Sequence, residues 1–280
     1  KKEGIKFKCN VDVGKDISIE ELQNKFDAIL ISTGSTKKRS LDIPGSYLHG
    51  IEQAMDFLTH NNKFVDKQIN AHLDRYNAKD KDIIVIGGGD TGSDCIGTSN
   101  RHGARSVINF ELSHKPGKNR DSSNPWPYWP FTLKTTSSHQ EGVSREWSIL
   151  TKKFIGDKYN NIIGLETVNV EVDKVTGRFT EIPNSSKTWN CDMVILALGF
   201  TGPEEALPNL LNIDMNNRGN ISSNSDYQTI KNNIFTAGDC RRGQSLIVWA
   251  ISEGREAAYH IDKFLMGTST LPQKNSLGDL

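Results

Sequence analysis

The sequence predicts an α/β protein built around parallel sheets, and two observations support this prediction. First, short apolar runs rich in β-branched residues recur between turn residues, which is typical of strands buried on both faces beneath helices. Second, a stretch of helical length joins the second and third runs at 90–102, so that 83–110 forms a strand–helix–strand unit. The five apolar runs are 28–31, 83–86, 107–110, 193–198 and 234–237.

Three other segments follow different patterns. In 165–182, alternate valines and a turn signal at 175–178 predict a small antiparallel meander with one solvated face. Residues 113–145 are rich in Pro, Ser, Asn, Lys and Trp and show little periodicity, which predicts a long excursion loop. Residues 267–280 are expected to form a flexible polar tail.

Length and composition narrow the class of function. The 280 residues fit about two domains, and 34 Lys and Arg against 34 Asp and Glu disfavour nucleic-acid and membrane-surface partners. No apolar run approaches the roughly 20 residues that cross a bilayer. The four cysteines form no CxxC pair and the histidines no ligand-like cluster, so we assign no metal. A reducing compartment is expected, the cytoplasm first and an organelle as the alternative.

The strongest local signal is a glycine-rich turn directly after the second predicted strand. Gly87, Gly89 and Gly92 form a GxGxxG pattern that opens the following helix, which is the context a dinucleotide-binding turn requires. Gly87 permits a tight turn, Gly89 lets the backbone approach a pyrophosphate, and Gly92 permits close helix packing. The first helical turn, with Asp90 and Thr91, would direct its N–H groups toward the phosphates. The alternative is a glycine-rich turn without a ligand.

An acidic residue follows this turn at the spacing expected of a ribose ligand. Glu111 stands directly after the third predicted strand, where its carboxylate would accept hydrogen bonds from both hydroxyls of an adenosine ribose. The same charge would repel a 2′-phosphate, which favours NADH over NADPH. Lys115, Lys118 and Arg120 lie nearby in the sequence, and we interpret them as solvated surface rather than as phosphate ligands.

Two further strand ends carry candidate ligand-binding residues, and those at the second are suited to a flavin. The first predicted strand leads into Thr33 and Gly34, where backbone can pass close to a flat or phosphorylated group, with a plain strand terminus as the alternative. The last strand ends in Gly238 and Asp239, whose carboxylate would bond a ribitol hydroxyl or, alternatively, cap a turn. A helix expected over 246–260 would present its positive end to the flavin ring. Three more candidates at its start are Gln244, Ser245 and Leu246.

The order of these motifs resembles the two-dinucleotide-binding flavoprotein reductases, in which an NAD domain is inserted into an FAD domain. A narrower resemblance is to the C-terminal, β-subunit-like region of NADH-dependent glutamate synthase, carried by residues 87–95, 124–130 and 238–255. NADPH-type members of that family have an Arg pair after the second strand of the NAD domain. This sequence has Leu112 and Ser113 there, which agrees with the preference for NADH.

This resemblance implies FAD-domain segments at 1–45 and 201–266, an NAD-binding domain at 46–200 and a tail at 267–280. It implies that NADH passes a hydride to FAD. Electrons would then travel through iron–sulfur clusters to FMN, where glutamate forms from glutamine and 2-oxoglutarate. Synthase and glutaminase domains of the same longer chain are the implied partners. No side chain is assigned as acid, base or nucleophile, because hydride transfer depends on the alignment of two rings.

The family's earlier GxGxxG turn and its cluster-binding cysteines do not occur in this sequence. We therefore expect a C-terminal fragment of a longer enzyme. Two alternatives stay open: a related flavoprotein such as a dihydropyrimidine dehydrogenase, and a non-catalytic dinucleotide-binding regulatory module. The aromatic residues Trp126, Tyr128 and Trp129 are either a contact surface for another domain or a loop packed over its own core.

Overall fold

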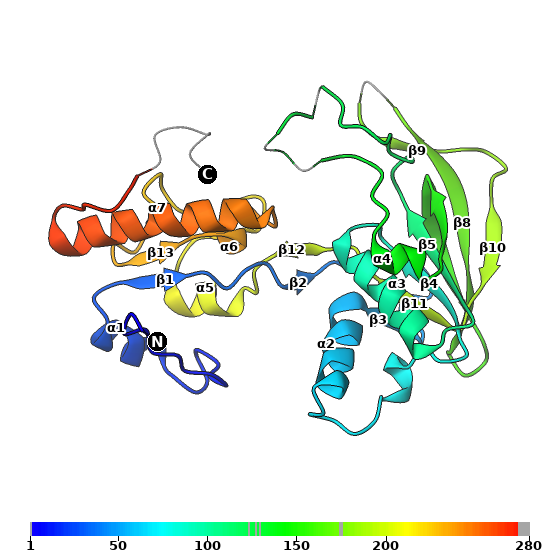
Figure 1. Ribbon diagram of the computed structural model, residues 1–280, viewed down its shortest axis with the longest axis horizontal. Helices are drawn as coiled ribbons and strands as arrows, with labels where there is room; N and C mark the ends of the chain where they lie inside the picture. The colour runs from blue at the N-terminus through cyan, green and yellow to red at the C-terminus, as the bar shows by residue number, and fades with distance from the viewer. Residues whose placement is uncertain (1, 123, 127, 129, 174–175, 274–280) are drawn as a thin grey trace. The chain divides into compact units, whose positions relative to one another are not determined.

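The computed structural model describes residues 2–122, 124–126, 128, 130–173 and 176–273, and divides the chain into two compact units (Figure 1). Residues 39–199 form the first, which we call the central unit. Residues 1–38 and 200–280 form the second, which we call the split unit because its two segments flank the central unit in the sequence.

A five-stranded parallel sheet is the framework of the central unit, and its strand order is β3-β11-β4-β5-β6. The strands predicted at 83–86, 107–110 and 193–198 are confirmed as its three middle members, whereas β3 and β6 were not predicted. The five strands, in sheet order, are β3 (Ile51–Gln53), β11 (Met193–Leu196), β4 (Asp82–Ile86), β5 (Ser106–Glu111) and β6 (Ser144–Trp147).

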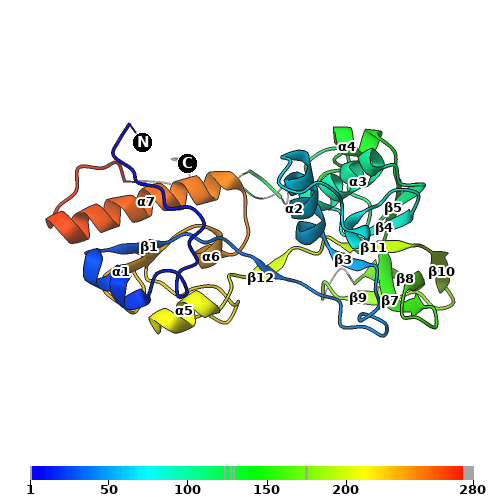
Figure 2. The same cartoon turned by 90° about the horizontal axis from the view of Figure 1, so that it is seen from below.

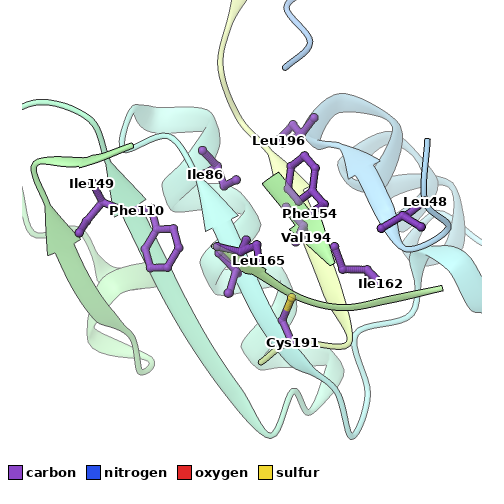
Figure 3. Close-up of a cluster of buried hydrophobic side chains, with 11 residues drawn as sticks. Leu48, Ile86, Phe110, Ile149, Phe154, Ile162, Leu165, Cys191, Val194 and Leu196 are labelled. Atoms are coloured by element: carbon purple, nitrogen blue, oxygen red, sulfur yellow. The ribbon is translucent and has the colours of Figure 1, made fainter. Parts of the chain in front are cut away.

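Side chains of the middle strands alternate between two apolar clusters, one on each face of the sheet. Ile83 and Val85 of β4 pack with the helices α2 (Ala54–Val65) and α3 (Asp90–His102). Ile84 and Ile86 enter the opposite cluster, which Figure 3 shows. Because successive side chains of a strand point to opposite faces, the middle strands are buried on both faces of the sheet, as the apolar runs predicted.

The opposite cluster is closed by an antiparallel sheet, which confirms the predicted meander (Figure 2). Its main strands are ordered β10-β8-β7, with β9 paired to β8. Val170 is buried while its neighbours Asn169 and Glu171 are exposed, so this part of β8 has one solvated face as expected. Residues 174–175 of the predicted turn lie outside the described residues. The four strands are β7 (Ile149–Gly156), β8 (Ile162–Val172), β9 (Phe179–Glu181) and β10 (Lys187–Asn190).

The predicted loop at 113–145 is wrong in its last part. Residues Ser137–Gln140 form the short helix α4, and β6 begins at Ser144 and pairs with β5. A hydroxyl–hydroxyl hydrogen bond of 2.5 Å between Ser93 and Thr136 ties this segment to α3. The prediction failed because β6 is an edge strand with the sequence Ser-Arg-Glu-Trp, which contains no apolar run to reveal it.

Part of the predicted aromatic surface can be placed. Trp126 and Tyr128 are each more than 60% exposed, so these two side chains do not pack over the core. Pro127 and Trp129 lie outside the described residues, as do residues 274–280 of the predicted tail. The role of this surface in contacting another domain stays a prediction.

The split unit is built on a parallel strand pair, β1 (Ile29–Ile31) and β13 (Ile234–Thr236), which confirms the strands predicted at 28–31 and 234–237. The helix expected over 246–260 is also present and runs further, as α7 (Ile247–Met266). The remaining elements are η1 (Asp74–Tyr76) in the central unit and α1 (Ile19–Lys25), β2 (Lys37–Lys38), β12 (Phe200–Gly202), α5 (Ala206–Leu211) and α6 (Asp239–Arg242) in the split unit.

One strand departs from the prediction that every apolar run is buried on both faces. Leu30 of β1 is 40% exposed, because it lines an open apolar groove together with Ile19 and Leu22 of α1 and Leu207 of α5. In the part of the chain that the structure describes, no helix is long and apolar enough to cross a membrane, and no cluster of His, Cys, Asp or Glu is arranged to hold a metal ion.

Three histidines pack together where α2, the segment after it and the end of α3 meet. The ring centroids of His72 and His102 lie 4.4 Å apart, and those of His60 and His72 lie 5.5 Å apart. Burial, together with the neighbouring His72, Arg101 and His60, lowers the pKa of His102 to about 4. His102 Nδ1 also accepts a hydrogen bond from a backbone N–H, which requires the neutral ring. The surroundings of His102 therefore hold its imidazole uncharged.

We expect the central unit to lose stability as the pH falls from about 6.5, the ordinary pKa of histidine, toward about 4. The pKa of His102 is lower in the folded state than in the unfolded state. Its contribution to stability is therefore complete above the unfolded pKa. It is lost as the pH falls toward the folded pKa, because the unfolded state takes up a proton first. The contribution is of order 1 kcal/mol after allowance for solvent screening. His102→Gln should flatten the pH dependence of urea unfolding between neutral pH and about pH 5, whereas the exposed control His49→Gln should not. Equal pH dependence in H102Q and the unmodified protein would contradict this.

Candidate dinucleotide-binding sites

The predicted glycine turn lies between β4 and α3, and two of its glycines are required by the fold itself. Gly87 has φ of +115°, and a Cβ there would lie 2.2 Å from the carbonyl oxygen of Ala197. A Cβ on Gly92 would lie 2.2 Å from the carbonyl oxygen of Gly87, because α3 packs closely against the strand end. Any larger residue at either position would force the backbone apart.

Gly89 differs from its neighbours. Its φ is −75°, which any residue adopts, and no described heavy atom lies within 4 Å of the position a Cβ would take. The fold therefore does not need glycine here. Gly89 is the N-cap of α3, and among the described residues no side chain caps this helix. The N–H groups of the first turn, which includes Asp90 and Thr91, are thus open to an anion such as a pyrophosphate.

A cavity of about 320 Å³ lies over this turn within the central unit. One wall is the turn itself with the end of β5, and another is the start of β7. Residues 130–134 of the excursion loop contribute a further wall, so part of that loop lies at the candidate site. The size and the mainly apolar lining with a few polar groups suit the binding of part of a nucleotide.

Glu111 is where the sequence placed it, at the end of β5 beside the turn, but its charge is not isolated. A Cβ on Gly88 would lie 1.9 Å from Glu111 Cδ, so the carboxylate rests directly against the turn. Arg145 Nη2 donates a 2.7 Å hydrogen bond to Glu111 Oε1, and both side chains are mostly buried. The repulsion of a 2′-phosphate by Glu111 is therefore weaker than for the lone carboxylate assumed from the sequence.

Arg145 was missed because it lies on β6, the edge strand within the segment that we expected to be a loop. Its Nη1 donates to the backbone oxygen of Lys134 at 2.8 Å, and its guanidinium stacks on Trp147 with 4.9 Å to the ring centroid. The guanidinium thus links Glu111 to the backbone of Lys134, and so connects two walls of the cavity. Of the three residues interpreted as solvated surface, Lys115 and Lys118 are exposed and do not line the cavity. For Arg120 the interpretation is wrong, because its side chain is half-buried and donates to the backbone oxygen of Tyr128 at 3.3 Å.

We expect Gly89→Ala to weaken nucleotide binding while leaving the fold intact. The added methyl group has room in the protein but occupies the space over the helix N-terminus where a phosphate would approach. Calorimetric titration with NADH should show a loss of affinity of about tenfold or more, with an unchanged thermal midpoint. Gly254→Ala, at another position with open space, is the matched control. Unaltered NADH affinity in G89A would argue against binding at this turn.

The flavin candidates of the split unit meet at one edge of its strand pair. Because β1 and β13 run parallel, with Ile31 opposite Thr236, the segments that follow them emerge side by side. These segments hold Thr33 with Gly34 and Gly238 with Asp239. Gly34 has φ of +75°, and no described heavy atom lies within 4 Å of its Cβ position, so the backbone there is open to a ligand.

The remaining flavin candidates lie at the entrance to α7. Ser35 Oγ donates to Gln244 Oε1 at 3.3 Å, which brings Gln244 to the end of β1. Ser245 and Leu246 directly precede α7, and Leu246 is its N-cap without a described side-chain cap. The first turn of α7 is therefore open to a partially negative group, as the sequence indicated.

A buried carboxylate on α7 organises this edge. Glu253 Oε2 accepts a 2.8 Å hydrogen bond from the N–H of Gly238, and Oε1 accepts from Arg241 at 2.8 Å and from Arg242 at 3.3 Å. The Glu253 side chain is 5% exposed. The turn after β13 is thus fixed to α7 by one anion with two cations and a backbone donor.

We expect Glu253→Gln to destabilise the split unit by about 2 kcal/mol, because two guanidinium groups lose a buried counter-ion and the turn loses a charge-assisted hydrogen bond. Chemical denaturation should show the change as a lower midpoint. Asp262→Asn removes a charge from the same helix and should have little effect. An E253Q midpoint equal to that of the unmodified protein would refute the organising role of Glu253.

A parallel sheet followed by a glycine turn, with a helix N-terminus beside it, is the fold of the dinucleotide-binding α/β class. Residues 2–254 match the model of the pyridine nucleotide-disulphide oxidoreductase family, and the chain belongs to this family. Solved structures with this fold include FprA from Mycobacterium tuberculosis in complex with NADPH, with a TM-score of 0.67 and 15% identity over 92% of this chain and 68% of the other. A thioredoxin reductase from Lactococcus lactis has a TM-score of 0.54 and 21% identity, over 86% of this chain and 66% of the other.

Curated relatives are more similar in sequence. The chain is 46% identical to "Glutamate synthase [NADH]" from Schizosaccharomyces pombe over 98% of its length, but covers 14% of that protein. It is 42% identical to "Glutamate synthase [NADPH] small chain" from Mycobacterium tuberculosis, covering 96% of this chain and 56% of that one. The chain therefore spans a small part of the yeast relative and about half of the bacterial small chain.

Proposed function

We propose that this chain is the NADH-oxidising, electron-input region of a glutamate synthase, and that it passes a hydride from NADH to FAD. The observation that carries the proposal is the glycine turn at residues 87–92, where the fold leaves Gly89 open and sets Glu111 beside it. The identity of 46% to a glutamate synthase named for NADH, within an oxidoreductase family, supports the assignment.

In this proposal each unit holds one nucleotide. Gly87, Gly89 and Gly92 with the first turn of α3 bind the pyrophosphate of NADH, and Glu111 bonds the adenosine ribose. The FAD-binding residues of the split unit are Thr33, Gly34, Gly238, Asp239, Gln244, Ser245 and Leu246. When bound, the nicotinamide supplies the hydride and the flavin accepts it. The chain contributes binding and ring alignment, and we assign no side chain to proton transfer.

The later steps belong to parts of the enzyme beyond this chain. In the proposal, electrons leave FAD through iron–sulfur clusters to FMN, and glutamate forms from glutamine and 2-oxoglutarate in synthase and glutaminase domains of the longer protein. The coverage of 14% of the yeast relative supports further domains in the longer protein.

Rapid mixing of the full-length protein with NADH under anaerobic conditions tests the proposal. We expect the absorbance of the bound flavin to bleach, because hydride transfer reduces its ring. Glutamate should then form when glutamine and 2-oxoglutarate are added. Bleaching without glutamate formation would favour a related reductase such as a dihydropyrimidine dehydrogenase. NADH binding without bleaching would favour a regulatory module. G89A, which should bleach slowly at the same NADH concentration, ties the reaction to the glycine turn.

A further inference from the structure

The Arg145 side chain has more hydrogen-bonding capacity than its present partners use. The side chain is 12% exposed, with Nη2 bonded to Glu111 and Nη1 to the backbone oxygen of Lys134. Its Nε is buried and has no hydrogen-bond partner among the described residues. A guanidinium presents five donors in a planar fork that matches a phosphate, so a cation of this kind is suited to a second, anionic ligand.

The position of Arg145 places that capacity at the ribose end of the cavity. Arg145 lies on β6 opposite Asn109 of β5, two residues before Glu111, and its guanidinium reaches forward along β5 to the Glu111 carboxylate. Both side chains line the cavity. A nucleotide whose ribose contacts Glu111 would therefore carry its 2′ substituent next to Arg145.

Charge decides which coenzyme this arrangement accepts. In the ion pair the charges of Glu111 and Arg145 largely cancel, and the guanidinium donates to one carboxylate oxygen. A ribose hydroxyl that approaches the pair therefore meets a hydrogen-bond acceptor. Without the carboxylate charge, Arg145 is a mostly buried cation that has lost its counter-ion. Such a group binds a replacement anion strongly, because leaving it unpaired is costly.

We propose that Arg145 is a 2′-phosphate receptor masked by Glu111, and that the ion pair between them sets the preference for NADH over NADPH. This inference rests on the proposed dinucleotide binding at the glycine turn. It makes Arg145 a specificity-determining residue and predicts opposite effects for the two partners of one ion pair. Loss of Glu111 unmasks the receptor, whereas loss of Arg145 leaves an uncompensated carboxylate that repels a 2′-phosphate.

The test compares Glu111→Gln, Arg145→Gln and the double variant in the full-length protein. Calorimetric titration with 2′,5′-ADP and with ADP separates the 2′-phosphate from the rest of the nucleotide, and kcat/KM is measured for NADH and NADPH. We expect E111Q to bind 2′,5′-ADP about tenfold more tightly or better, and to shift its kcat/KM ratio toward NADPH. R145Q should shift the ratio further toward NADH, and the double variant should lose the gain of E111Q.

A matched control is Glu141→Gln, which breaks the ion pair between Glu141 and Arg101 on the same unit, away from the cavity. It should leave both ratios unchanged. Glu111→Ala removes the same charge and replaces E111Q if that variant does not fold. The inference is overturned if removal of the Glu111 charge brings no gain for 2′,5′-ADP, if the double variant keeps the gain, or if R145Q weakens both coenzymes equally. Failure of the unmodified protein to bind NADH would instead overturn the proposed function.

Discussion

The close approach of two backbone segments determines the geometry of the cavity over the glycine turn. The carbonyl oxygen of Ala197, just after β11, occupies the space that any side chain at residue 87 would need. The same strand ends are joined by hydrogen bonds from the Gly87 N–H to the Phe110 oxygen and from the Ala197 N–H to the Ile86 oxygen, each 2.8 Å long. With the turn held on both sides, α3 begins at a fixed point and its N–H groups face the cavity. The open surface at Gly89 and the position of Glu111 both follow from this constraint.

Most of the middle of the central unit could be predicted from the sequence because its signals are local. The apolar runs at β4, β5 and β11 are buried on both faces, and the glycine pattern lies in the turn directly after β4. The edge strand β6 could not be predicted, since its Ser-Arg-Glu-Trp sequence resembles a loop and becomes a strand only by pairing with β5. The partner of Glu111 was missed for the same reason. A charge relationship between residues 111 and 145 exists only in the folded sheet, so the sequence argument treated Glu111 as an isolated carboxylate.

Each unit has a carboxylate beside a glycine at a strand end, buried at Glu253 and mostly buried at Glu111, but the hydrogen bonds of the two differ. Glu253 accepts hydrogen bonds from the backbone N–H of Gly238 and from the guanidinium groups of Arg241 and Arg242, so its oxygens are committed to holding the turn. Glu111 rests against Gly88 and shares one oxygen with a single guanidinium, which leaves capacity on the other oxygen for a ligand. Glu253 therefore fixes the turn of the split unit, whereas Glu111 keeps the free oxygen that the proposed ribose contact requires. The number of internal donors around each carboxylate accounts for this difference.

The contrast among the three glycines of the turn has an evolutionary consequence. Residues 87 and 92 are constrained by the path of the chain, so any descendant that keeps this architecture must keep them. Residue 89 is constrained only by whatever approaches it from outside. A gene copy released from coenzyme binding would thus preserve the first and third glycines while the second drifted to alanine or serine. If a coenzyme binds here as proposed, we expect glycine at position 89 in lineages that use the pocket and other small residues in lineages that do not.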